Sequence, residues 1–320
     1  MHKPFASLSC DLDDKWTYMK AHGDPAWEHL PSYLATVVPR LLALLNEHGL
    51  QATFFLVGQD AVVENNRALF RSIAMAGHEI GNHTFHHDPW LHLYSEKEIA
   101  DEIARAEDQI EEATGQRPVG FRGPGYSLSW DTVRALARRG YLYDSSTLPT
   151  FIGPLGRAYY FMSSKLTRDD LERRKNMFGV FRDGFRPIRP YKWDVDGKSL
   201  MEIPVTTMPF LRVPIHISYV LYLSLYSQTL AEGYFRIALA MCRVAGVEPS
   251  ILLHPLDILD MDEASGVSFF PGMRLPLERK LGLVNRCLEK LKETFHVVTI
   301  REHAMRAAQE AVLPLIGPVL

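Results

Sequence analysis

The sequence predicts an α/β fold in which helices alternate with the strands of a parallel sheet. The main support is a pattern that recurs along the chain: a helical segment ends at a glycine, and a short apolar run follows. A glycine just past a helix adopts the left-handed conformation that ends it, and a continuous apolar run is typical of a buried parallel strand. In addition, 320 residues of which 47% are hydrophobic are enough to build a sizeable core.

The first half of the chain gives the clearest elements. An apolar strand is expected up to Cys10, before the first helix. The recurring pattern then occurs three times, with helical segments at 41–47, 68–76 and 133–139, glycines at Gly49, Gly77 and Gly140, and strands at 52–57, 78–80 and 141–143. Between the second and third occurrences, Ser95 and Glu98 predict a capping box that starts a helix with an apolar face from Ile99 to Ala113.

The second half is less regular. Residues 150–200 are rich in Gly, Pro, Arg and aromatic residues, which predicts an insertion or cap, and residues 209–247 are apolar and are expected to be helical. Strand character returns at 249–254, a helix is expected over 277–291, and a last strand is expected over 295–300. Because the alternation encloses the irregular segment, the sequence favours one barrel-like domain over residues 1–320 with an elaborated rim.

Composition excludes several classes of protein. Thirty-five basic and 38 acidic side chains give a net charge of −3, and without a long basic run the chain lacks the electrostatic footprint of a nucleic-acid binder. Its three cysteines, Cys10, Cys242 and Cys287, are far apart and have no disulfide or zinc-site spacing. Since the N-terminal residues show no signal-peptide pattern, the expected location is the cytoplasm.

One stretch needs a separate interpretation. Residues 213–231 carry no formal charge over 19 residues, which is within the length range of a membrane span. Pro214, His216, Gln228 and several hydroxyl side chains make the stretch too polar for that. The first interpretation is helices packed on the core, and the alternative is an aromatic surface that contacts a membrane or a lipid-linked sugar.

A cluster of carboxylates follows the first strand. Asp11, Asp13 and Asp14 stand where α/β barrels place catalytic groups, at the carboxyl end of a strand. Adjacent carboxylates repel one another, so the cluster is typical either of a cation site or of a solvated acidic turn.

Two histidines follow a later strand. His83 and His87 are four residues apart, a spacing at which two imidazoles can share a divalent ion. With a carboxylate from the first strand they form a set that leaves coordination positions open for water and substrate. The competing interpretation is ordinary surface histidines, because His78, His86 and His92 lie nearby in the sequence.

Two shorter motifs complete the candidates. Arg122 lies in a turn with Pro124 and Gly125, where it could hold a carboxylate through a bidentate pair or could simply be a surface arginine. Leu253 and His254 end the late strand. A histidine at this position could serve as a general acid or base, or it could be a core residue whose hydrogen bonds are satisfied.

Together these motifs resemble the polysaccharide deacetylase family, also described as the NodB-homology or carbohydrate esterase 4 family. They occur in the order of the family: the Asp11–Asp14 cluster, His83-Thr-Phe-His-His87, the turn with Arg122 and Pro124, and Leu253-His254. The resemblance covers roughly residues 5–145 and 200–300. It implies a distorted (β/α) barrel and a hydrolase that removes an N-acyl group, most simply acetyl, from an amino sugar.

The resemblance also implies a role for each residue. Asp13, His83 and His87 would hold a divalent metal, most simply Zn²⁺, with Co²⁺, Ni²⁺ or Mn²⁺ as alternatives. Asp11 would be the general base, Arg122 would orient it, and His254 would protonate the departing amine. A backbone N–H near Gly125 would help to stabilise the oxyanion, and Leu253 would border the substrate.

This sequence departs from the family pattern in two places. Its Asp-x-Asp-Asp cluster is followed by Lys15-Trp16, so Asp13 as base with Asp14 as ligand stays open. The family motif that backs the catalytic histidine, an aspartate with a tryptophan, has only Asp144, Trp193 and Asp194 as candidates.

Several functions therefore remain in competition. The leading hypothesis is N-deacetylation of an amino sugar or glycan precursor, either free in the cytoplasm or lipid-linked at the inner face of the membrane. The alternatives are a hydrolase of another C–N bond, such as a deformylase or cyclic amidase, and a non-catalytic glycan- or lipid-binding relative. No nucleic-acid partner is expected.

Overall fold

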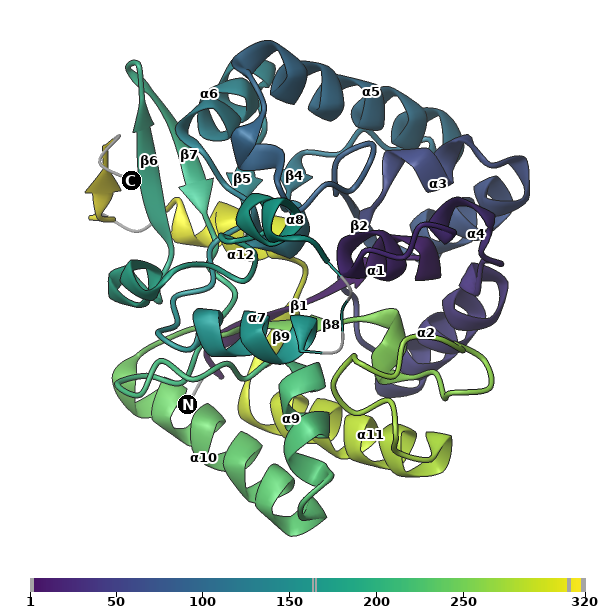
Figure 1. Cartoon of the computed structure of the whole chain (residues 1–320). Helices are drawn as coiled ribbons and strands as arrows, with labels where there is room; N and C mark the ends of the chain where they lie inside the picture. The colour runs from purple at the N-terminus through teal and green to yellow at the C-terminus, as the bar shows by residue number, and fades with distance from the viewer. Residues whose placement is uncertain (1–2, 163, 165, 310–311, 318–320) are drawn as a thin grey trace.

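A computed structural model describes residues 3–162, 164, 166–309 and 312–317 of the chain, and Figure 1 shows their arrangement. The described strands are β1 (Phe5–Leu12), β2 (Thr53–Leu56), β3 (Glu79–Asn82), β4 (Gly120–Phe121), β5 (Tyr143–Asp144), β6 (Tyr191–Val195), β7 (Lys198–Glu202), β8 (Ser250–Leu253), β9 (His296–Val298) and β10 (Leu315–Ile316). The described α-helices are α1 (Lys15–His22), α2 (Leu34–His48), α3 (Gly58–Val62), α4 (Glu64–Met75), α5 (Glu96–Thr114), α6 (Trp130–Arg139), α7 (Gly153–Phe161), α8 (Arg168–Arg173), α9 (Ile217–Ser224), α10 (Gln228–Ala245), α11 (Leu277–Thr294) and α12 (Ile300–Ala307).

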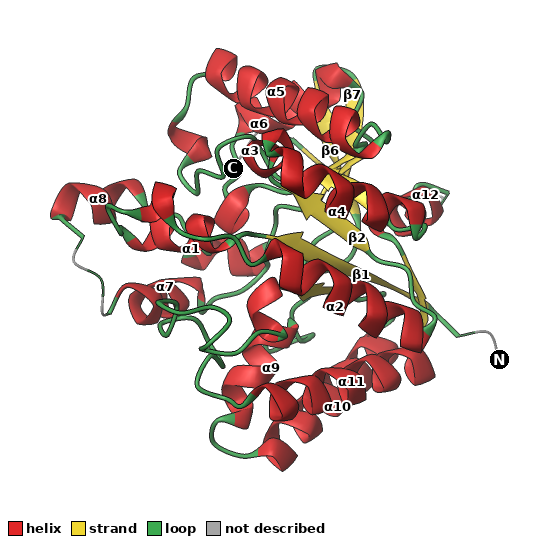
Figure 2. Cartoon of the chain, turned by 90° about the vertical axis from the view of Figure 1, so that its right-hand side faces the viewer, coloured by secondary structure: helices red, strands yellow, loops and turns green. Residues whose placement is uncertain are grey.

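The strands form a single sheet in the order β10-β6-β7-β5-β4-β3-β2-β1-β8, with β9 paired to the start of β1. All pairs are parallel except the antiparallel hairpin of β6 and β7. Helices α10 and α11 lie on one side of β1, and α5 and α6 lie on the other side (Figures 1 and 2). The predicted α/β class and its parallel sheet are therefore confirmed.

The strand pairing stops short of a closed barrel, because no ladder joins β8 to the far end of the sheet within the described residues. The segment that follows β7 lies between β5 and β8 and forms hydrogen bonds with residues on both sides. Val205 N donates to Thr147 O at 2.9 Å, and Thr206 N donates to Ser250 O at 3.0 Å. Ser250 N in turn donates to the hydroxyl of Thr206 at 2.7 Å. These bonds bring β5, the post-β7 segment and β8 together as a distorted barrel requires.

The carboxyl ends of β1 and β2 point toward α1, α7 and α8, as Figure 2 shows. Strand β1 can lie at the centre of the molecule because its residues from Ala6 onward are buried on both faces. The carboxyl ends of parallel strands open onto the same edge of the sheet, so loops from distant parts of the chain converge there. This edge is where the polar sequence motifs are expected to meet.

The local signals that predicted the first helices are present in the structure. Gly49, Gly77 and Gly140 all have positive φ, between 62° and 83°, at or just past a helix end. The Ser95 side chain accepts a hydrogen bond from the Glu98 N–H, and the Glu98 side chain accepts one from the Ser95 N–H, so the capping box is complete.

The last predicted strand and the predicted helical segment 209–247 differ from the structure. The last strand, expected over 295–300, ends at Val298, because the Thr299 side chain caps α12 by accepting from Glu302 N. The helical segment expected over 209–247 begins only at Ile217, and its first residues instead form a turn in which Thr207 bridges to Pro214. Proline at 214 lacks the N–H that a helix interior needs.

Residues 150–200, expected as an irregular cap, contain α7, α8, β6 and the start of β7, which pairs with β6 as a hairpin. The hairpin joins the main sheet through β5, and its Tyr191, Trp193 and Val195 are buried while Lys192 and Asp194 are less so. Helices α7 and α8 lie outside the sheet, beside α1 (Figure 2). Among the described helices, none combines the length and apolarity that crossing a membrane requires.

Candidate active site

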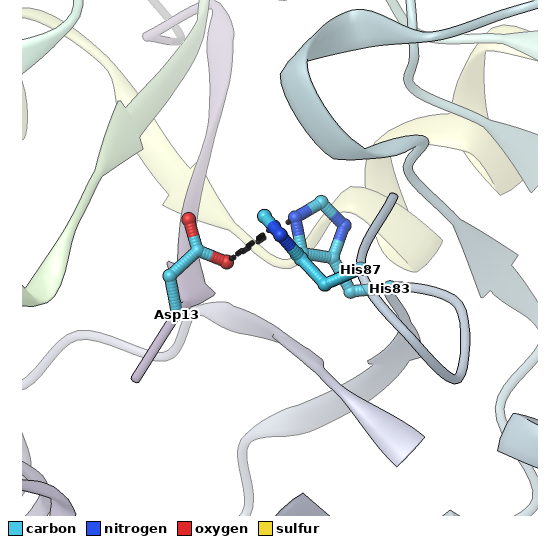
Figure 3. A group of neighbouring side chains, drawn as sticks. All are labelled: Asp13, His83 and His87. Atoms are coloured by element: carbon cyan, nitrogen blue, oxygen red, sulfur yellow. Dashed lines mark ion pairs between the residues drawn. The ribbon is translucent and has the colours of Figure 1, made fainter. Parts of the chain in front are cut away.

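Three buried side chains from two strand ends meet at the carboxyl edge of the sheet (Figure 3). Asp13 follows β1, and His83 and His87 lie in the loop after β3. One ligand atom from each residue lies within 4.8 Å of the others. The Asp13 Oδ1 atom is 3.0 Å from His87 Nε2 and 3.4 Å from His83 Nε2. The structure thus brings together the three predicted metal ligands.

The donor atoms of this group suit a cation. Nδ1 of His83 donates to the carbonyl oxygen of Arg122 at 2.6 Å, which leaves the lone pair of Nε2 facing Asp13 in the neutral ring. Asp13 Oδ1 and His87 Nε2 are buried, and neither has a hydrogen-bond partner among the described residues. Buried polar atoms are costly when unpaired, and one carboxylate with two imidazoles is a set that divalent Zn²⁺ and its neighbours bind. The residues therefore fit a metal ion.

The electrostatics of the group keep its carboxylate ionised. Burial raises the pKa of Asp13, but the charge of His87 and the close side-chain contacts with both histidines outweigh burial and hold that pKa well below its usual value. Burial lowers the pKa of His83, whereas Asp11 and Asp13 raise it by more, so the net shift is upward. Protons and a cation compete for the same imidazole nitrogens, so metal binding is expected to weaken as pH falls.

The loop that carries His83 and His87 is held in shape by hydrogen bonds to nearby side chains. Thr84 and His87 have positive φ of 65° and 52°, so the pair lies on a tight loop and not on a helical turn. Asn82 Oδ1 accepts from Thr84 N, and Glu102 Oε2 accepts from Phe85 N and His86 N. These side chains thus act as acceptors for backbone N–H groups of the loop, which are not bonded within a strand or helix.

The nearby histidines that competed in the sequence have other partners. His86 pairs with Glu102. His78 Nδ1 accepts from Ala52 N at 3.2 Å, and His92 Nδ1 contacts the Ser127 hydroxyl at 3.0 Å. The spacing between His83 and His87 singles out the two histidines that face Asp13.

Asp11 and Arg122 form a buried ion pair. Arg122 Nη1 donates to Asp11 Oδ1 at 2.6 Å and also to the Ser9 hydroxyl at 3.1 Å. The remaining donors of Arg122 bind the carbonyl and hydroxyl oxygens of Ser145, so the predicted bidentate pair is wrong. The guanidinium holds only one oxygen of Asp11, and Oδ2 lies 4.0 Å from His83 Nε2.

Asp14 has a structural position. Its Oδ1 accepts from Lys15 N at 2.7 Å, which caps helix α1, and from Tyr33 N at 3.1 Å. It lies outside the group of three ligand atoms. Burial raises its pKa, and hydrogen bonds only partly offset that shift. Between the two alternatives for the aspartates, the geometry favours Asp13 as ligand and leaves Asp11 available as base.

His254 directly follows β8 and lies on the same cavity as Asp11, Asp13, His83 and His87. Gly125 also borders this cavity, and its φ of +56° is one that glycine adopts without strain. Leu253 does not border it: the side chain is buried in the main hydrophobic cluster, because consecutive residues of a strand face opposite sides.

The residues expected behind His254 are elsewhere. Asp144 forms a buried pair with Glu202, Trp193 Nε1 donates to Glu202 at 2.9 Å, and Asp194 is exposed. Burial and the charge of Glu202 raise the pKa of Asp144 well above its usual value. The side chains that back His254 are instead Ser218, whose hydroxyl is 2.9 Å from Nδ1, and Asp257. No motif spacing pointed to Ser218, which lies in the apolar segment.

The cavity has a volume of about 310 Å³ and two different walls. The polar residues named above line one part of it. Helices α7 and α9 and the loops beside them contribute an apolar and aromatic wall, which includes Leu155, Tyr159, Tyr160, Tyr219, Tyr222 and Phe270. A pocket of this kind, with a few convergent polar groups, is typical of a small-molecule or substrate site.

Comparison with known proteins gives one family. The model of the polysaccharide deacetylase family matches residues 25–143. A peptidoglycan deacetylase from Helicobacter pylori is 31% identical over 111 residues, which cover 35% of this chain and 37% of the relative. A peptidoglycan deacetylase-like protein from Gibberella zeae is 34% identical over 176 residues, 54% of this chain and 49% of the relative. The chain thus spans less than half of the length of these curated relatives.

Solved structures match over nearly the whole chain. A putative polysaccharide deacetylase from Mycobacterium smegmatis has a TM-score of 0.65 at 22% identity and covers 100% of this chain and 96% of that one. A probable polysaccharide deacetylase from Pseudomonas aeruginosa has a TM-score of 0.57 at 17% identity, with 96% and 91% covered. At these identities the likeness shows the fold, including the parts outside residues 25–143.

Proposed function

Because residues 25–143 of this chain belong to the polysaccharide deacetylase family, we propose that the protein is a metal-dependent hydrolase that removes the N-acetyl group of an amino sugar. The observation that carries the proposal is the convergence of Asp11, Asp13, His83, His87 and His254 on one cavity. An amide needs an activated water, a stabilised oxyanion and a proton for its nitrogen, and this set provides residues for each.

In the proposed mechanism Asp13, His83 and His87 hold the ion, with Zn²⁺ as the simplest choice and Co²⁺, Ni²⁺ and Mn²⁺ as alternatives. When bound, a divalent cation supplies positive charge that polarises the amide carbonyl and favours ionisation of water.

The other groups of the site move protons and stabilise charge. Asp11 accepts the proton of the attacking water, and the ion pair with Arg122 keeps Asp11 ionised and in place. A backbone N–H near Gly125 donates to the developing oxyanion. His254 gives a proton to the departing nitrogen, so the amine leaves neutral.

The proposal is tested by assaying the purified, metal-loaded protein on N-acetylglucosamine oligomers and on peptidoglycan fragments. Relatives named peptidoglycan deacetylases make an N-acetylated glycan the first substrate class to try. We expect acetate and a free amine in equal amounts. Release of formate from N-formyl sugars, or ring opening of cyclic amides, without acetate would favour the deformylase or amidase alternative. Tight glycan binding with no product from any of these would indicate a binding protein.

We further propose that the substrate carries an apolar group beside the amino sugar, as a lipid-linked glycan precursor does. The support is the wall formed by α7 and α9, where the Tyr159 and Tyr222 rings lie 5.5 Å apart. Near the same wall Leu155 and Tyr226 are 70% and 72% exposed. An apolar chain of the substrate that extended out of the cavity between α7 and α9 would cover these two exposed side chains. Phe235, an aromatic residue of the apolar segment 209–247, is instead buried in the core.

This finer proposal predicts a substrate preference. An N-acetylglucosamine glycoside with an octyl aglycone should be deacetylated with at least about tenfold higher kcat/KM than the methyl glycoside, because part of the chain leaves water on binding. Leu155→Asp should remove most of the preference, whereas Leu171→Asp, on an exposed position of α8 outside the cavity, should retain it. Equal kcat/KM for both glycosides would contradict an apolar subsite, and no binding to liposomes would contradict membrane contact. The cytoplasmic location stays a prediction.

A further inference from the structure

One hydroxyl group is held against the inner nitrogen of the proposed catalytic acid. The Ser218 Oγ atom lies 2.9 Å from His254 Nδ1. Ser218 is in the first turn of α9 and is only 1% exposed, whereas His254 directly follows β8, so two elements distant in the chain meet at this contact. The family comparison matches residues 25–143 and therefore assigns nothing to either residue.

A second residue, Asp257, holds the backbone of His254. Asp257 Oδ2 accepts from His254 N at 2.8 Å and lies 4.0 Å from His254 Nδ1. Asp257 is fully buried in the short turn Pro255–Asp257. Burial raises the pKa of Asp257, and the charge of His254 and hydrogen bonding with Ser218 oppose that shift. Ser218 therefore lies close to both His254 and Asp257.

The other ionisable groups around His254 do not take the place of Ser218. His216 precedes α9, with its ring 6.2 Å from His254, and burial lowers its pKa to about 3, so it is neutral. The ammonium of Lys280 donates to the carbonyl oxygens of Leu256 and Leu259. On β1, Asp11 is paired with Arg122, and burial raises the pKa of Cys10.

The protonated form of His254 fixes the direction of these bonds. An imidazolium ion has two N–H donors and no acceptor, so its Nδ1–H must donate to Ser218 Oγ. The hydroxyl hydrogen of Ser218 is then directed to another acceptor, and the Asp257 carboxylate, which interacts with Ser218, is an anionic acceptor in the turn. In this arrangement Nε2–H is the proton that faces the cavity.

We infer that Ser218 is a positioning residue that orients His254 and links its Nδ1–H to Asp257, so that Nε2 delivers a proton to the leaving nitrogen. The inference rests on the proposed deacetylase function. As the C–N bond breaks, its electron pair stays on nitrogen, the proton moves from Nε2 to that nitrogen, and the neutral imidazole keeps its Nδ1–H on Ser218. The role assigned by the family to an aspartate with a tryptophan is thus filled by a serine and an aspartate from other positions.

The experiment compares two leaving groups. An N-acetyl sugar needs a proton on nitrogen, whereas 4-nitrophenyl acetate releases a stable phenolate that needs none. We expect Ser218→Ala to lower kcat for the N-acetyl sugar by about 10- to 100-fold, the range for a lost hydrogen bond to a charged group. Its kcat for 4-nitrophenyl acetate should change by less than about threefold. Ser218→Thr keeps a hydroxyl group and should recover most of the lost activity.

A matched control separates this effect from lost stability. Ser224 is a buried serine of the same helix whose hydroxyl donates to Leu221 O, away from His254, so Ser224→Ala should act on both substrates like the wild type. If Ser218→Ala lowered both activities by the same factor, or if Ser218→Thr were as impaired as Ser218→Ala, the positioning role would be overturned. A wild-type protein that cleaved neither substrate would overturn the proposed function, and this inference with it.

Discussion

His87→Ala is expected to abolish metal binding and deacetylation together. Nε2 of His87 is 3.0 Å from Asp13 Oδ1 and has no hydrogen-bond partner in the described part of the chain, so this nitrogen is available as a ligand atom. Removing it leaves a carboxylate and one imidazole, which bind a divalent ion far more weakly than three ligands do. We expect turnover below about 1% of wild type, because the cation provides several kcal/mol of charge stabilisation in such reactions.

Two measurements check this prediction without depending on each other. Metal content after dialysis should be close to one ion per wild-type chain and close to none for His87→Ala. Adding the ion should raise the thermal unfolding midpoint of the metal-free wild type but not that of the variant, because a ligand that binds only the folded state stabilises it. His92→Ala is the matched control, since His92 contacts Ser127 outside the metal group. Full hydrolysis by a thoroughly chelated wild type would contradict metal dependence.

The sequence identified the residues at strand ends but not those that support them. Asp13, His83 and His87 could be found because parallel strands bring their carboxyl ends to one edge, so polar residues after different strands converge there. Ser218 could not be found in the same way. It lies in an apolar helix, and its contact with His254 depends on how α9 packs against the end of β8.

Some of the differences between the predicted and the observed elements have local causes that the sequence contains. Tyr191, Trp193 and Val195 alternate with Lys192 and Asp194, a strand pattern that the surrounding Gly, Pro and Arg residues obscured. Thr299 with Glu302 three residues later is a helix-start signal that ends the last predicted strand early. By contrast, the single-oxygen contact between Arg122 and Asp11 depends on Ser9 and Ser145, which compete for the guanidinium only in the folded chain.

The division of roles between the aspartates leads to the sharpest test of mechanism. Asp11→Asn preserves the shape of the side chain but removes its capacity to accept a proton from water. Only Oδ1 of Asp11 is bound by Arg122, and Asp11 is outside the group of metal ligands, so the ion should remain at full stoichiometry. Loss of a general base typically lowers turnover by about 10²- to 10⁴-fold, and we expect kcat to fall within that range.

Asp13→Asn and Asp14→Asn complete the comparison. Asp13→Asn should lose the ion, because Asp13 Oδ1 is the carboxylate oxygen that lies within 3.4 Å of Nε2 of both imidazoles. Asp14→Asn should keep the ion and most of the activity, since an asparagine can still accept from Lys15 N and cap α1. Metal analysis and kcat for the three purified variants therefore give three different outcomes. If Asp11→Asn lost the metal while Asp14→Asn kept it but lost turnover, Asp11 would be the ligand and our assignment of the base would be wrong.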